Sequence, residues 1–147
     1  SGTPYVTSSI APAKGERPLH IQFPYVTKNI TVQNLDVTAG DNLRLAFTYS
    51  GSFAVGDTLP FGGGTKPEAD QSATAYQGNN FFVIPSMTAV ANSGNAGQVT
   101  LDVRCKDLWL MSDSAEEVRF SLYAGMTGIS REQFPVLTAS TKFKGVG

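Results

Sequence analysis

The side chains that could do nucleophilic or acid–base chemistry are few and far apart in this sequence. It contains one histidine, His20, and one cysteine, Cys105. A Ser–His–Asp or Cys–His arrangement would have to use His20, which lies between Leu19 and Ile21 in a run of alternating apolar and polar residues. No Gly-x-Ser-x-Gly nucleophile elbow is present. We therefore expect His20 to be a packing or surface residue, and Cys105 to be a buried, unreactive thiol.

The carboxylates and the possible metal ligands give no stronger indication of an active site or a metal site. Glycosidase chemistry needs two carboxyl groups that face each other across a cleft, whereas Glu116 and Glu117 are adjacent and would point to opposite faces of a strand. Zinc prefers clusters of cysteine and histidine. Asp57, Glu68 and Asp70 could ligate calcium, but solvated loop charges explain them more simply. The sequence thus predicts no enzymatic activity, no metal site and no cofactor.

Aromatic side chains are better candidates for contact with another molecule. Trp109 or Tyr123 on an exposed sheet face could stack on a sugar ring, although the run Leu-Trp-Leu-Met around Trp109 is more typical of a core or a subunit interface. Three isolated aromatics, Phe53, Phe61 and Tyr76, lie between residues 51 and 78, where no hydrophobic period is visible. These five residues are the candidate ligand or interface positions.

Composition restricts the classes of partner. The chain has 147 residues, the size of one domain, and a net charge of −1 from 11 basic and 12 acidic residues. It has no basic run that would bind a phosphate backbone, so we expect no nucleic-acid partner. Its apolar stretches are far shorter than the ~20 residues of a membrane-spanning helix, so we expect no membrane insertion. Only 16% of the residues are charged, which suits surfaces that meet other subunits.

The elements that must position these residues are β-strands. Apolar and polar residues alternate with a period of two, which is the signature of strands with one buried face. A slip of this pattern at Lys106 and Asp107 indicates a bend that lets the chain pass from one sheet to another. A single helical turn is expected near residues 130–133. The strand-like segments are residues 19–23, 30–33, 43–49, 81–84, 99–105, 108–111, 118–124 and 134–139.

These strands predict an all-β fold, a two-sheet antiparallel β-sandwich, with the eight-stranded jelly roll as the expected version. An immunoglobulin-like sandwich has the same periodicity, and only strand connectivity separates the two. We interpret residues 1–17 as an extended N-terminal arm and residues 18–147 as a single sandwich domain.

Several sequence segments resemble a known family. They read Phe-Pro-Tyr-Val-Thr at residues 23–27, Ile-Thr-Val at 30–32, Arg-Cys-Lys-Asp-Leu at 104–108 and Tyr-Ala-Gly-Met-Thr-Gly-Ile at 123–129. In these segments the chain resembles the small single-jelly-roll, penton-like capsid proteins of icosahedral double-stranded DNA viruses, over about residues 18–140. The resemblance implies a virion location, other capsid subunits as partners, and a cyclic homo-oligomer, with a pentamer favoured over a trimer.

Two functions are therefore expected from different classes. The first is a structural virion component, a capsid or vertex protein. The alternative is a carbohydrate- or receptor-binding sandwich, such as a lectin or fibre-tip domain, located outside the cell or on its surface. In the alternative, the 51–78 loop, or Trp109 and Tyr123, would contact a glycan or receptor. Oligomeric state and glycan binding separate the two.

Overall fold

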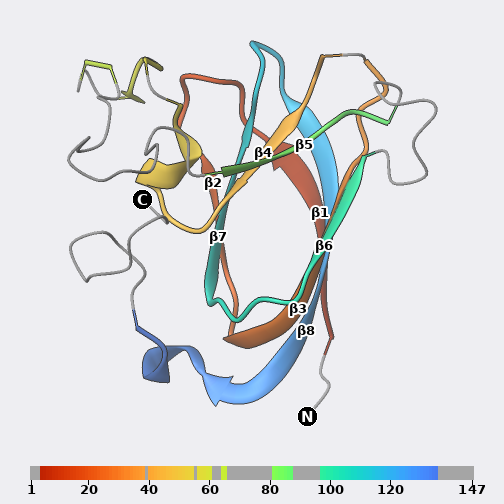
Figure 1. Ribbon diagram of the computed structural model, residues 1–147, viewed down its shortest axis with the longest axis vertical. Helices are drawn as coiled ribbons and strands as arrows, with labels where there is room; N and C mark the ends of the chain where they lie inside the picture. The colour runs from red at the N-terminus through yellow and green to blue at the C-terminus, as the bar shows by residue number, and fades with distance from the viewer. Residues whose placement is uncertain are drawn as a thin grey trace, which may run out of the picture.

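Eight β-strands form two four-stranded antiparallel sheets that pack face to face (Figure 1). The computed structural model describes residues 4–38, 40–54, 56–60, 64–65, 81–87 and 97–135. Sheet A has the order β1 (Pro4–Ala11), β8 (Val118–Ser130), β3 (Tyr25–Asn34) and β6 (Gln98–Leu101). Sheet B has the order β2 (Leu19–Gln22), β7 (Asp107–Ser112), β4 (Leu43–Ala46) and β5 (Phe81–Ile84).

Strand connectivity identifies the sandwich as a jelly roll. β1 pairs with β8, β2 with β7, β3 with β6, and β4 with β5, all antiparallel. These pairs fall alternately in sheet A and sheet B, as when one long hairpin is rolled into a two-layered barrel. The predicted β-sandwich is confirmed, and this strand order is that of the jelly roll.

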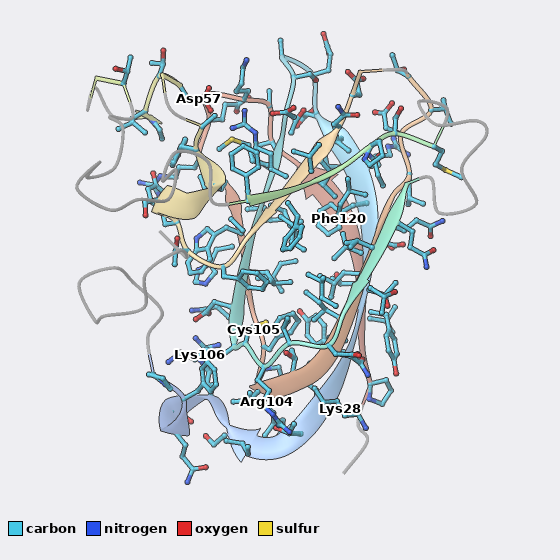
Figure 2. The ribbon with its side chains drawn as sticks, viewed as in Figure 1. Lys28, Asp57, Arg104, Cys105, Lys106 and Phe120 are labelled. Atoms are coloured by element: carbon cyan, nitrogen blue, oxygen red, sulfur yellow. The ribbon has the colours of Figure 1, made fainter. Side chains whose placement is uncertain are left out.

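The core lies between the sheets and follows the two-residue period. Along β8, Val118, Phe120, Leu122 and Ala124 are buried, while Arg119 and Tyr123 between them face outward. Phe120 is fully buried between the two layers (Figure 2). The predicted faces of this strand are therefore confirmed.

The chain passes between the sheets near the predicted bend, but the strand expected at residues 99–105 ends at Leu101. The chain leaves sheet A after Leu101 and enters sheet B at Asp107, and residues 102–106 belong to neither sheet. The short 3-10 helix η3 (Arg131–Gln133) matches the expected helical turn. Of the segment 134–139, the structure describes only residues 134–135, which are not strand; the others lie outside the described residues.

The strand expected at residues 43–49 differs from the prediction. It ends at Ala46, and all four residues of β4 are buried rather than every second one. Residues that follow it, including the 3-10 helix η1 (Ser50–Ser52), close over the outer face of this strand. A period of two predicts one buried face, but it does not show that a later segment will cover the other.

The N-terminal segment is extended, but it is part of the sandwich. Eight residues of the expected arm form β1, whose partners run from Pro4 opposite Gly125 to Ala11 opposite Val118. β1 is thereby one of the two edge strands of sheet A, and β6 is the other.

Candidate functional site

An uncharged row of side chains crosses the outer face of sheet A. Val6 of β1 lies opposite Tyr123 of β8, and Tyr123 lies opposite Thr31 of β3. Thr31 in turn lies opposite Thr100 of β6, with 3.1 Å between the two hydroxyl oxygens. Val6 is 70% exposed and Tyr123 45% exposed. The row is therefore apolar at the β1 edge and hydroxyl-bearing at the β6 edge, and no charge interrupts it.

The edge at β1 is open to pairing. Among the described strands, β1 pairs only with β8, so the backbone groups along its other edge have no strand partner there. Its sequence, Pro-Tyr-Val-Thr-Ser-Ser-Ile-Ala, has no charged residue, and Ile10 is 45% exposed beside the more exposed Val6. Monomeric proteins usually protect such edges with charges, prolines or bulges. This edge carries proline only at its first residue.

A buried cation holds a covering segment over β4, on the outer face of sheet B. Arg44 of β4 is 3% exposed; its Nε donates to Asp113 Oδ1 and its Nη1 to Asp57 Oδ2, both at 2.6 Å. Nη1 also donates to the carbonyl of Ser52 at 3.1 Å, and the guanidinium lies 4.6 Å from the centre of the Phe81 ring. These contacts tie Ser52 and Asp57 to the sheet; Asp57 is labelled in Figure 2. Asp57 is thus an ion-pair partner of Arg44.

The three candidate aromatics of the 51–78 loop are not equivalent. Phe53 is 1% exposed and packs edge-on against Tyr49, with ring centres 5.3 Å apart. It helps to cover sheet B and offers no surface to a ligand in this chain. Phe61 and Tyr76 lie outside the described residues.

Trp109 projects from the outer side of β7 and is already stacked. Its indole lies 4.2 Å from the His20 imidazole with an interplanar angle of 6°. His20 Nε2 is 2.9 Å from Asp107 Oδ1, which also accepts a hydrogen bond from Arg131 Nη2. Since Trp109 and Tyr123 belong to different sheets and both face outward, the structure does not bring them into one site. A sugar at Trp109 would have to use the indole face away from His20.

Cys105 is buried and held beside Thr27. The Thr27 hydroxyl donates to the Val103 carbonyl at 2.8 Å and accepts from the Cys105 backbone N–H at 3.0 Å. Burial is the main cause that raises the pKa of the Cys105 thiol to about 11. The hydrogen bond with the Thr27 hydroxyl lowers this pKa, and the negative charge of Asp107 raises it by a smaller amount. The thiol is therefore protonated at neutral pH, which makes it a poor nucleophile.

Raising the pH from about 8 to 11 should lower the free energy of unfolding through Cys105. Below the ordinary pKa of 9.0 the thiol is protonated in both states and has no effect. Above it the thiol ionises in the unfolded chain but not in the folded chain. The free energy of unfolding therefore falls by ~1.4 kcal/mol for each pH unit. We expect a loss of about 2–3 kcal/mol by pH 11, measured by urea denaturation. Cys105→Ala is the control, because the difference between the two proteins isolates this thiol; a difference that does not change with pH would contradict the prediction.

The part of the chain that the structure describes offers no metal site built from several ligating side chains. No group of three or more His, Cys, Asp or Glu side chains is placed there to hold a metal ion. Among the same described residues, no helix is long and apolar enough to cross a membrane.

Sequence reasoning missed two features that matter for the surface. The expected arm includes Val6 and Ile10, although the β-branched and aromatic residues of 4–11 are a strand signal. The alternation in residues 43–49 places Arg44 on an outward face, and no local signal shows that a later segment covers that face.

Comparison with known proteins does not assign this chain to a family. No protein-family model matches the sequence, and no curated protein matches it. The geometry of the sheets and their surfaces is therefore the basis for a functional proposal.

Proposed function

We propose that this protein is a structural virion component, a capsid or vertex subunit that assembles with copies of itself into a closed ring. Five copies are the expected number, and three are the alternative. The observation that carries the proposal is the open β1 edge, where Val6 and Ile10 stand exposed beside the uncharged row that runs from Val6 to Thr100. Other capsid subunits would be the further partners.

An open edge next to an apolar strip is suited to a ring. In a cyclic assembly each subunit presents one surface to the next copy and receives a different one, and the ring closes if the rotation allows. An unpaired strand edge supplies directional backbone hydrogen bonds, and exposed apolar side chains add burial on association. Val6 and Ile10 are on the same face of β1, so one neighbour can cover both.

The placement of charges favours the same surface. Several charges are engaged within the subunit, as in the pairs that Arg44 makes with two aspartates and that Arg131 makes with Asp107. The row from Val6 to Thr100 holds none. Because removing ions from water is costly, an interface forms more readily on an uncharged face.

The virion setting is supported by the fold and the resemblance together. The jelly-roll connectivity agrees with the resemblance to single-jelly-roll capsid proteins. Since one fold serves many functions, self-assembly is the part of the proposal to test first.

A lysine on the β1 edge should dissociate the assembly. We expect the purified protein to form a ring of defined mass by size-exclusion chromatography with light scattering. Val6→Lys or Ile10→Lys should weaken association at least about ten-fold, because each places a charge in the buried contact. Val83→Lys is the matched control: Val83 is as exposed as Ile10, at 45%, but lies on β5 of sheet B.

Circular dichroism should show the same strand content in all three variants. Rings that persist in both edge variants would overturn the role of β1. A wild-type chain that stays monomeric and binds members of a glycan array would replace the proposal with the carbohydrate-binding alternative.

A further inference from the structure

An open groove lies at one end of sheet A, beside the proposed interface. Its volume is about 600 Å³, and it is bordered by the end of β1, the start of β8 and the loops that precede β2, β4 and β8. Three apolar side chains line it and remain in contact with solvent: Ile10 is 45% exposed, Leu35 38% and Val37 66%. Ile10 also belongs to the open edge, so the groove continues the assembly surface.

The rim of this groove is acidic. Glu16, Asp36, Glu116 and Glu117 line it, and Arg119 is the one basic residue among its lining residues. Four carboxylates against one guanidinium leave a net charge of −3 when all are ionised. Glu116 and Glu117 are exposed. A suitable occupant would therefore combine positive charge with apolar side chains.

The C-terminal segment of this chain has that chemistry. Residues 138–147 read Thr-Ala-Ser-Thr-Lys-Phe-Lys-Gly-Val-Gly, with two lysines and no acidic residue. We propose that the groove binds this segment from a neighbouring copy, with Lys142 and Lys144 at the carboxylates and Phe143 on the apolar floor. This inference rests on the proposed self-assembly, for which it names a second contact.

Distance favours a neighbour over the same chain. The groove lies at the Arg119 end of β8, whereas the η3 turn follows the other end of β8 at Ser130, and the described chain ends just after it at Pro135 (Figure 1). At about 3.3 Å per residue, the length of β8 between these two positions is up to about 36 Å. Lys142 is seven residues beyond Pro135, a reach of at most about 25 Å even when fully extended.

The experiment uses two charge-reversed full-length chains. One carries Glu116→Lys and Glu117→Lys in the groove; the other carries Lys142→Glu and Lys144→Glu in the tail. We expect each alone to associate at least about ten-fold more weakly than wild type by light scattering, and a chain that combines both reversals to regain association, because every tail and groove in its ring again carry opposite charges. Asp102→Lys with Glu132→Lys is the matched control, because it makes the same change in net charge outside the groove lining.

A labelled peptide of residues 138–147 provides a readout that does not depend on assembly. It should bind the tail-reversed chain in fluorescence anisotropy, and binding should fall at least about ten-fold in about 0.5 M salt, which screens exposed charges. Adding the groove substitutions Glu116→Lys and Glu117→Lys to the tail-reversed chain should weaken peptide binding as much as the salt does. A peptide with both lysines changed to glutamate should bind this doubly reversed chain again.

The outcomes separate this inference from the proposed function. If the chain with both reversals does not regain association, or if peptide binding is insensitive to salt and to groove reversal, the groove contact is wrong while the β1 interface stands. If wild type is monomeric but the peptide binds as expected, the proposed assembly fails and the groove keeps its preference for a cationic segment.

Discussion

Replacing Arg44 with methionine should lower the free energy of unfolding by about 3–5 kcal/mol, the range seen when one partner of a buried ion pair is removed. The Arg44 side chain is 3% exposed, and Asp57 is 11% exposed, so the change leaves a carboxylate in a poorly solvated site. Asp113 is 31% exposed and should contribute less, because solvent screens it. Urea denaturation followed by circular dichroism measures the effect.

Two control variants make the Arg44 prediction specific. Arg44→Lys keeps the charge but loses the planar fork that reaches both aspartates, so we expect an intermediate loss. Arg119→Met removes an exposed guanidinium from the outer face of sheet A and should change stability by no more than about 0.5 kcal/mol. A loss below about 1 kcal/mol for the methionine variant of Arg44 would show that the cluster does not hold residues 52–57 on sheet B.

Replacing Thr27 with valine should cost about 2–4 kcal/mol, because two buried backbone groups lose their partner. Valine has nearly the same shape, but it leaves the Cys105 N–H and the Val103 carbonyl without the hydroxyl that satisfies them. A buried polar group without a partner costs ~1–3 kcal/mol. Thr27 is fully buried, so water cannot replace the lost contacts without rearrangement. Urea denaturation of the variant and the wild type measures the difference.

Thr27→Ser is the matched comparison for this site. It keeps the hydroxyl and removes one methyl group, for an expected loss of about 1 kcal/mol. Valine should therefore be the more destabilising substitution even though it is the more hydrophobic one. If valine were as stable as serine or more so, the hydroxyl would not be what fastens residues 103–105 to β3.

The outer surfaces of the two sheets differ in how far they are covered within the subunit. The Arg44 cluster holds a covering segment over β4 of sheet B, whereas the outer face of sheet A carries exposed Val6 and Tyr123. The surface over β4 is therefore packed within the subunit, and the β1 side of sheet A is available to another molecule.

Side-chain periodicity alone determined the fold class and most strand faces. Residues 118–124 alternate so regularly that the period by itself assigns their buried and exposed sides, because successive side chains of a strand point to opposite faces. The slip at Lys106 and Asp107 likewise located the passage between sheets. The scarcity of histidine, cysteine and basic runs shaped the functional expectations in the same way.

Tertiary structure decided what depends on contacts between distant residues. Whether residues 4–11 were an arm or a strand depended on pairing with β8, more than 100 positions away. Arg44 became buried because Asp57 and Asp113, from two other segments, converge on it. Trp109 and Tyr123 have similar local sequence signals, yet pairing placed them on different sheets. Local period reports which way a side chain points, but only the packing of remote segments determines what it meets there.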